Sequence, residues 1–231
     1  EDEEMAKTYE LTYKKYEKLA QPRWVDLQYA IEIYPEQRNL FVDVKGHVVN
    51  KTNESIRDIH FNIPSSLDSV VINIPGAKIA LNDTRLKYRI YRLTTPMMPG
   101  DTLLIHTYGH HIAKGFENYV SNTSVTQNGT FFNNMEILPS IGYSTGAELS
   151  DKNKRREYGL PPRRRMPKLD TTDMDARGRM YLDVDADLVN VSTVIGTSED
   201  QIAIAPGSLR REWKKNGRRY FEYTLDHASA N

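Results

Sequence analysis

Alternation of apolar and polar residues with a period of two recurs along this chain and limits the folds open to it more than any other feature. Turn-forming residues interrupt the alternation about every ten residues, which is the spacing of short antiparallel strands. The clearest rows are Leu27, Tyr29, Ile31 and Ile33; Leu40, Val42, Val44 and Val48; and Ile59, Phe61 and Ile63. This pattern predicts an all-β fold, either curved antiparallel sheets or a β-sandwich, and not repeated strand–helix–strand units.

Two antiparallel hairpins are predicted. The first joins residues 27–33 to residues 40–48 across a proline-containing turn and leaves one face in water. The second lies within residues 86–108, where an alternating half is followed by an apolar half. Pro99 presets a turn between the halves and Gly100 tolerates a positive φ, so the two halves are expected to fold back on each other.

Further strands are expected on both sides of an irregular middle region. They are residues 70–74, residues 189–195, a short buried strand at 201–205, and residues 219–225. Asn128 and Gly129, between Val125 and Phe131, have the residue types of a two-residue hairpin turn. Residues 133–180 lose the strand period, so this region is predicted to be mostly irregular.

An amphipathic connector helix is predicted within residues 1–23. Tyr9, Tyr13 and Tyr16 recur at helical spacing, with lysines elsewhere around the helix. Acidic residues at its start suit the helix dipole, and Pro22 marks its end. We interpret it as a lead-in helix that docks through its tyrosines, with a membrane-surface or partner-binding helix as the alternative.

Composition excludes several classes of protein. Lys plus Arg equals Asp plus Glu, at 31 each, so the net charge selects neither a nucleic acid nor an anionic membrane as partner. The absence of cysteine excludes disulfides and thiolate metal sites. No run approaches the roughly 18 apolar residues of a membrane span, and the acidic start is unlike a signal peptide. We expect residues 24–231 to form one β domain. The segment is expected to be soluble by itself and to be part of a longer protein.

A basic insertion is predicted at about residues 148–180. Residues 151–168 hold eight Lys or Arg against two Asp or Glu. A helix is expected only over residues 150–158, where Ser150 caps the start and Gly159 ends it. The rest of the insertion is expected to be irregular.

Arg163, Arg164 and Arg165 are the candidate partner-binding residues of this insertion. A charge run in a proline-bearing loop is solvated or docks on an acidic surface of its own protein. No nucleic-acid-binding signature accompanies the arginines, so no nucleic acid is predicted as a partner.

The sequence contains one string typical of a catalytic site and several histidines, but neither feature predicts a catalytic or metal site here. Residues 142–146 match the G-x-S-x-G string, but they lack the buried strand and long helix that expose a nucleophilic Ser144, so a flexible loop is predicted. His47 and His60 are expected to be solvated on the polar sides of their strands. No H-E-x-x-H string occurs, so we predict no catalytic residue and no metal site in this segment.

Three passages, in this order, resemble the N-terminal β domain of the aminopeptidase N-like zinc metallopeptidases. They are residues 24–41 with 48–52, residues 93–103, and residues 193–209. The resemblance implies a curved-sheet β domain that supports the chemistry of a following catalytic domain. Zinc and the catalytic glutamate are expected only in that downstream domain, so this segment is expected to bind no cofactor and hydrolyse nothing by itself.

Four shorter passages resemble a bacterial branch in which such a peptidase-like region is fused behind the membrane permease of an ABC transporter. They are residues 131–143, 147–151, 158–162 and 216–221. This resemblance implies two partners in the same chain, an upstream permease region and a downstream catalytic domain. It also implies membrane tethering on the outer, periplasmic face.

The resemblance also points to substrate-binding candidates. In the enzymes, the N-terminal domain lends polar residues that hold the free amine of the substrate, and the corresponding place here carries Asn133 and Glu136. The spacing to Pro139 is shorter than in the family and the Asp-Glu-Pro string that follows there is missing. The predicted function is a non-catalytic β domain sheltering one side of a zinc-peptidase-type cleft; the alternative is a partner- or peptide-binding module of a transporter without hydrolytic activity.

Overall fold

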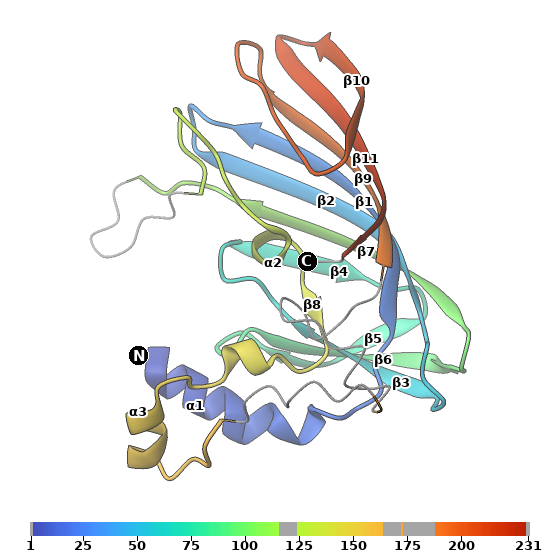
Figure 1. Cartoon of the computed structure of the whole chain (residues 1–231), viewed down its shortest axis with the longest axis vertical. Helices are drawn as coiled ribbons and strands as arrows, with labels where there is room; N and C mark the ends of the chain where they lie inside the picture. Colours follow the sequence, from blue (N-terminus) through green and yellow to red (C-terminus); the bar gives the residue numbers. More distant parts are fainter. Residues whose placement is uncertain (1, 116–123, 164–171, 173–187, 230–231) are drawn as a thin grey trace.

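The computed structural model describes residues 2–115, 124–163, 172 and 188–229 of the chain (Figure 1). Its helical elements are α1 (Asp2–Tyr13), η1 (Lys14–Tyr16), α2 (Asn134–Ile137), η2 (Thr145–Ala147) and α3 (Lys152–Glu157). Its strands are β1 (Arg23–Tyr34), β2 (Asn39–Val49), β3 (Ile56–Asn62), β4 (Ser69–Asn73), β5 (Ala77–Asp83), β6 (Tyr88–Met97), β7 (Thr102–His111), β8 (Ser140–Ile141), β9 (Leu188–Ser198), β10 (Ser208–Lys215) and β11 (Arg218–Ser229). Strands dominate, as the period-two alternation predicts.

The strands form two sheets with one main core between them. The larger sheet has the order β10-β11-β9-β1-β2-β7-β4, and the smaller has the order β5-β6-β3-β8. Figure 1 shows the large sheet curving over the small one, with α2 on the inner side. The predicted mostly-β fold of curved sheets with one N-terminal helix is confirmed. The described pairs are antiparallel except β1 with β9, which are parallel. These two strands are far apart in sequence, so no hairpin turn fixes their relative direction.

The first predicted hairpin is confirmed. β1 and β2 pair antiparallel from Arg23 opposite Val49 to Tyr34 opposite Asn39. Along β2, alternate residues are buried and partly exposed, so one face of the hairpin lies on the core and the other meets water. The sequence period alone predicts this arrangement, because the partner strand is the next one along the chain.

The second predicted hairpin is wrong. The halves of residues 86–108 do form strands, β6 and β7, but β6 pairs with β3 and β5 in the small sheet. β7 pairs with β2 and β4 in the large sheet. The Pro99–Gly100 turn, with Gly100 at φ 88°, is therefore a corner between the sheets. Asn50 holds this corner: its side-chain amide donates to the Met97 carbonyl at 3.0 Å, and its own carbonyl accepts the Gly100 N–H at 2.8 Å.

The hairpin partner of β6 is β5, a strand that the period-two pattern did not indicate. β5 and β6 pair antiparallel from Ala77 opposite Leu93 to Asp83 opposite Tyr88. Lys87 has a φ of 54° in the connecting turn, and the Asp83 carboxylate accepts the Leu86 N–H at 2.9 Å. β5 is an edge strand with mostly exposed side chains, so it lacks the alternation of a strand that is buried on one face.

Two further predictions near the C-terminal half are wrong in part. Residues 201–205 are not a strand; Ala203 is buried, but Ile202 and Ile204 on either side of it are exposed. Asn128 and Gly129 lie in a turn, but the described residues 124–133 beside it form no strands. In both segments the apolar residues are present without a neighbouring strand to pair with.

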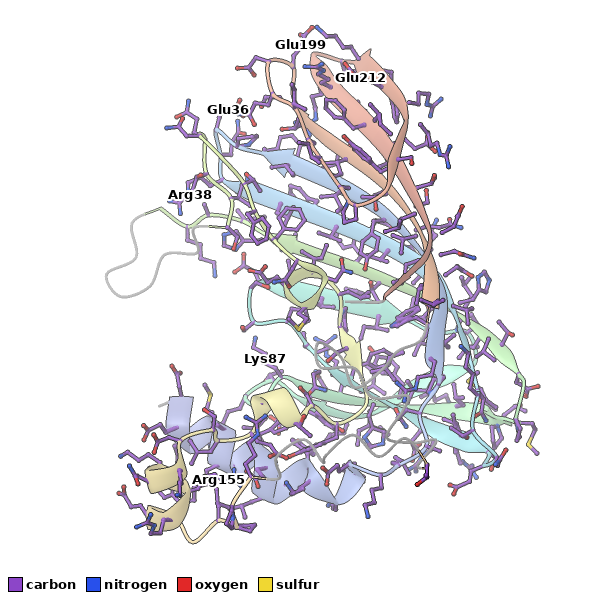
Figure 2. The ribbon with its side chains drawn as sticks, in the orientation of Figure 1. Glu36, Arg38, Lys87, Arg155, Glu199 and Glu212 are labelled. Carbon is purple, nitrogen blue, oxygen red and sulfur yellow. The ribbon has the colours of Figure 1, made fainter. Side chains whose placement is uncertain are left out.

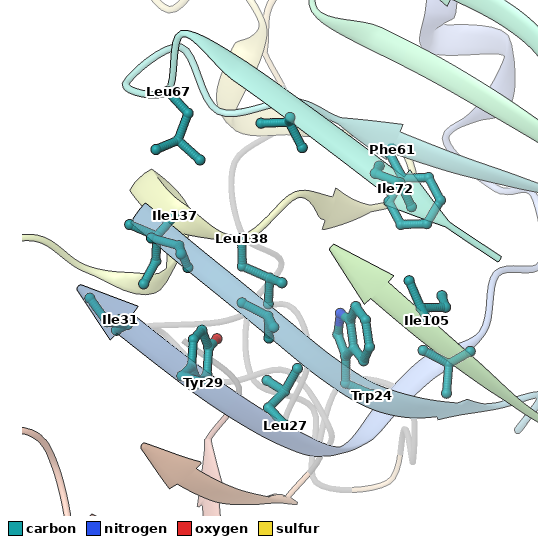
Figure 3. Packing of buried hydrophobic residues seen from close by; sticks show 14 of the residues in the cluster. Trp24, Leu27, Tyr29, Ile31, Phe61, Leu67, Ile72, Ile105, Ile137 and Leu138 are labelled. Carbon is teal, nitrogen blue, oxygen red and sulfur yellow. The ribbon is translucent and has the colours of Figure 1, made fainter. Parts of the chain in front are cut away.

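Tyr29 is an exception in an otherwise apolar core. Its ring belongs to the main core, in the same buried cluster as Ile31 of β1 and Ile137 of α2 (Figure 3). Among the described residues, its buried hydroxyl has no hydrogen-bond partner. Burial raises the pKa of this phenol. A buried hydroxyl without a partner costs stability because it has lost its hydrogen bonds to water.

Replacing Tyr29 with phenylalanine is expected to raise the free energy of unfolding by about 1 kcal/mol, since it removes the unpaired hydroxyl and keeps the ring. Urea unfolding followed by circular dichroism measures the change. Tyr223→Phe is the matched control, because the buried Tyr223 hydroxyl donates to the Ala203 carbonyl at 3.0 Å and its loss should destabilise. Equal destabilisation by both changes would show that Tyr29 also has a partner.

Helix α1 lies on the outer face of the small sheet and docks through its tyrosines, as predicted. Tyr9 and Tyr13 are buried, and the Tyr13 ring stacks on Tyr88 of β6 with centroids 4.0 Å apart. The α-helix ends at Tyr13, earlier than the predicted end, and continues as the 3₁₀ turn η1. Within the described residues, no helix is both long enough and apolar enough to cross a membrane.

Candidate functional site

The predicted substrate-binding residues Asn133 and Glu136 lie together at the start of α2. One oxygen of the Glu136 carboxylate accepts the Asn133 backbone N–H at 2.8 Å, and the other accepts the Ser124 hydroxyl at 3.3 Å. Both carboxylate oxygens thus bind groups of the chain itself, in the manner of a capping residue. Asn133 is exposed and Glu136 is partly buried. Their role toward a substrate stays a prediction.

Four large apolar side chains are exposed on the segment that contains α2 and on the β9–β10 connection. They are Phe131 (80% exposed), Met135 (69%), Ile202 (68%) and Ile204 (81%). We call these four residues the apolar rim. The two segments adjoin, because the Gln201 side-chain amide donates to the Gln127 carbonyl at 3.0 Å. A contiguous exposed apolar patch is typical of a surface that another body covers.

Local packing turns the rim residues outward. In the β9–β10 connection, Ala203 is buried and its carbonyl accepts the Tyr223 hydroxyl. Ile202 and Ile204, on either side of this anchor, are left exposed. In the other segment, Phe132 packs against the main core while Phe131 beside it is exposed. Anchoring of one residue in each segment thus places its neighbours in solvent.

A buried ion pair joins helix α1 to the basic insertion. Glu10 and Arg155 are both about 2% exposed, and their side chains form two hydrogen bonds of 2.7 and 2.8 Å. Arg155 also donates to the Leu149 carbonyl at 2.6 Å and the Pro161 carbonyl at 2.8 Å. Figure 2 labels Arg155 beside α1 and α3. Bidentate pairing and the extra acceptors offset the cost of burying the guanidinium.

A second buried carboxylate extends this network. Glu148, 5% exposed, accepts Lys14 at 2.8 Å and the Tyr143 hydroxyl at 2.9 Å. Arg163 Nε lies 3.8 Å from the same carboxylate, and Arg163 also donates to the Thr145 carbonyl at 2.5 Å. The hydrogen bond from Arg155 lowers the pKa of Glu10, more strongly than burial raises it. The described start of the insertion is therefore held to α1 and η1 by two ionic contacts, Arg155 with Glu10 and Glu148 with Lys14.

The candidate partner-binding arginines are only partly placed. Arg163 is exposed and contacts the network just described, while Arg164 and Arg165 lie outside the described residues. The cap of α3 lies one residue later than predicted, because the Asp151 carboxylate, and not Ser150, accepts the N–H groups of Asn153 and Lys154. Gly159, at φ 67°, follows its end as predicted. A partner for the three arginines stays a prediction.

Sequence reasoning missed Glu10, Glu148 and Arg155 as members of one cluster. Glu10 lies between Tyr9 and Tyr13 on the docking side of α1, and a carboxylate on a buried helix face needs a buried cation. The position of Glu10 therefore indicated that a cationic side chain pairs with it, but did not indicate which one. Arg155 is 145 residues away in sequence, so only the tertiary structure selects it from the eight basic residues of 151–168.

His60 is not solvated, contrary to the prediction. It is 2% exposed beneath η1, with its ring 4.6 Å from that of Tyr16 and its Nδ1 2.9 Å from the Tyr88 hydroxyl. Burial lowers the pKa of His60 to about 4, so the ring is neutral at neutral pH. His60 is buried because the polar side of β3 is the face that α1 and η1 cover. Burial likewise raises the pKa of Tyr9 to about 12.

Ser144 lies in a loop without the geometry of a nucleophile. The described residues place no histidine in hydrogen-bond contact with it, and its backbone N–H donates to the Tyr9 hydroxyl at 2.9 Å. A short 3₁₀ turn, η2, follows it in place of a long helix. The described part of the chain also brings no three His, Asp or Glu residues together as a metal site.

Aromatic side chains on the outer face of the large sheet contact one another rather than presenting free rings. Trp213 stacks on Tyr220 with centroids 5.3 Å apart, and the Arg211 guanidinium lies 4.2 Å over the Trp213 ring. Arg218 lies 4.0 Å over the ring of Tyr34. Contacts of this kind between side chains stabilise a solvent-exposed sheet face. We therefore do not assign this face a ligand.

No protein-family model and no curated protein matches this chain. Among solved structures, it is similar to the M1 zinc metallopeptidase of Deinococcus radiodurans, with 14% identity and a TM-score of 0.49. A mutant of that enzyme bound to a Tyr-Ser-Ala substrate gives 13% identity and a TM-score of 0.47. A mutant of a two-domain M1 zinc metallopeptidase bound to L-tryptophan gives 12% and 0.48.

Each of these alignments covers 88% of this chain and 39% of the other. The chain therefore spans about two fifths of the length of the proteins that it resembles in fold. The zinc, the peptide and the amino acid are ligands of those proteins.

Proposed function

We propose that this chain is the non-catalytic β domain of a longer, membrane-anchored protein of the aminopeptidase N-like kind, where it shelters one side of a zinc-peptidase-type cleft. The observation that carries the proposal is the apolar rim. Four large apolar side chains on adjoining segments, exposed by more than two thirds, call for a covering surface. The passages at 24–41, 93–103 and 193–209 follow the order of the aminopeptidase N-like family, so the covering surface we propose is that of the catalytic domain.

In this proposal the chemistry is divided between domains. The catalytic domain that follows holds zinc and the catalytic glutamate, while this chain supplies a wall of the cleft. Asn133 and Glu136, on the same segment as Phe131 and Met135, are the candidates to meet the free amine of a peptide. The upstream partner is the permease region of an ABC transporter, and the domain lies on the periplasmic side of the membrane.

A binding module of a transporter without hydrolytic activity is the second candidate. It is favoured by a basic hollow on the small sheet, where the side chains of Arg57 and Lys78 form no salt bridge within the described residues. The sequence after Asn231 separates the two candidates. The peptidase proposal requires an H-E-x-x-H string and a downstream glutamate within roughly 100 residues. If both are absent, the binding module is the candidate function that remains.

The apolar rim is expected to make the isolated chain self-associate, because the described residues leave its four side chains exposed. Ile204→Lys places a charge in the most exposed rim position and should weaken self-association about tenfold, which corresponds to about 1.4 kcal/mol. Sedimentation velocity over a series of concentrations measures the association constant.

Val71→Lys is the matched control. Val71 is 58% exposed on β4, at the opposite edge of the large sheet from β10, and outside the rim. Its replacement should leave the association constant unchanged. An equal effect of the two variants, or none from Ile204→Lys, argues that the rim is ordinary surface and removes the main support for the proposed function.

A further inference from the structure

The outer face of the small sheet has a shallow hollow of about 380 Å³. Its lining includes Arg57 of β3, Lys78, Ile79 and Ala80 of β5, and Arg92 and Thr94 of β6. Three cationic side chains thus surround one concave surface. The neighbouring part of the small sheet is covered by α1, and the hollow lies beyond that cover, among residues that α1 does not bury.

The charges around the hollow are incompletely paired. Arg92 donates two hydrogen bonds to the Asp58 carboxylate, at 2.8 and 3.0 Å, which leaves three of its N–H groups unused by that pair. In the described part of the chain, the side chains of Arg57 and Lys78 form no hydrogen bond and no salt bridge. Lys78 lies directly opposite Arg92 in the β5–β6 register. Like charges at opposed positions repel each other, so an anion bound there relieves the repulsion.

The hollow adjoins an unpaired sheet edge. β5 is the last strand of the small sheet, and no described strand hydrogen-bonds to its outer side. Ile79 on this strand is 56% exposed. An edge strand offers backbone N–H and C=O groups to an added strand, with alternate side chains of the ligand directed to either face. The hollow and the edge together thus present three kinds of contact. They are cationic side chains on one face, the apolar side chain of Ile79, and the backbone N–H and C=O groups of β5.

We propose that the β5 edge and this hollow bind an extended acidic segment of a partner protein in which acidic and apolar residues alternate. The acidic side chains meet Lys78 and Arg92, and the intervening apolar side chains meet Ile79. A second copy of this chain is a poorer occupant, because its β5 would bring another Lys78 to the same edge. The β-bulge at Ala80 also disfavours pairing with a regular copy of the strand.

A fluorescein-labelled peptide of eight residues, alternating Asp and Val, tests the proposal by fluorescence anisotropy with the whole chain. We expect saturable binding that weakens as salt increases, since the contacts are ionic. Lys78→Glu should weaken binding about tenfold by placing a like charge against the acidic residues. Lys45→Glu, an exposed lysine on β2 of the large sheet, is the matched control and should have no effect.

Two further probes separate main-chain pairing from charge alone. The same peptide with alternate backbone amides N-methylated keeps its charge but loses strand pairing, so its affinity should fall about tenfold. A peptide alternating Lys and Val should not bind. The proposal is overturned by equal affinity of the methylated peptide, by binding of the Lys peptide, or by no binding of the Asp peptide. Binding of phosphatidylglycerol vesicles in place of the peptide, lost in Lys78→Glu, would assign the hollow to a membrane surface instead.

Discussion

Arg155→Ala is expected to lower the free energy of unfolding by about 3 kcal/mol and to release α1 from the small sheet. The change leaves the Glu10 carboxylate buried with only the 3.4 Å contact to Lys14. It also leaves the Leu149 and Pro161 carbonyls without their donor. Urea unfolding measures the stability, and limited proteolysis within α1 measures its release.

Arg156→Ala is the control, because Arg156 is the exposed neighbour of Arg155 on α3. It should change stability by less than about 0.5 kcal/mol. The double variant Glu10→Leu with Arg155→Leu should be less destabilised than Arg155→Ala, since it leaves no buried charge unpaired. If Arg155→Ala and Arg156→Ala behave alike, the ion pair does not hold α1 in place.

The pH dependence provides a second measurement on the same pair. Arg155 lowers the pKa of Glu10 in the folded protein, so unfolded chains bind the proton more readily. The stabilisation is therefore fully present above the ordinary pKa of a glutamate and is lost as the pH falls through the lowered value. The stability difference between the wild type and Arg155→Ala should shrink over that acidic range.

Gly46→Ala is expected to destabilise the large sheet by about 3 kcal/mol, the upper end for overpacking a filled core. A Cβ at Gly46 lies 2.4 Å from the Asp26 carbonyl oxygen and 3.0 Å from Cζ3 of Trp24. The nearer atom belongs to the backbone of β1, at the bulge between Trp24 and Asp26, so relief requires the strands to separate. Thermal unfolding followed by circular dichroism measures the loss.

Gly196→Ala separates backbone obstruction from side-chain contact. A Cβ at Gly196 lies 2.5 Å from Oε2 of Glu32 and 2.6 Å from Cε1 of Tyr220, both on side chains that can turn away. We therefore expect a loss of about 1 kcal/mol, well below that of Gly46→Ala. A loss at Gly196 equal to or larger than that at Gly46 would contradict this account of the β1 bulge.

The candidate site shows where prediction from the sequence stopped. The tyrosine spacing in α1 indicated a docked helix face, and Asn133 with Glu136 were placed together because they are three residues apart in sequence. The apolar rim was not predicted, since Ile202 and Ile204 have the pattern of a buried strand. Their exposure depends on Ala203 alone being anchored by Tyr223, a contact between segments distant in sequence.

The sequence by itself determined that the chain is mostly strand, which faces of β1 and β2 turn inward, and that β1 and β2 form a hairpin. The tertiary structure alone decided that β6 and β7 lie in different sheets, that α1 covers His60, and that Arg155 pairs with Glu10. The physical reason is the range of the interactions. Alternation and turn residues act over a few neighbours along the chain, whereas strand partners and buried ion pairs depend on which distant surfaces the core brings together.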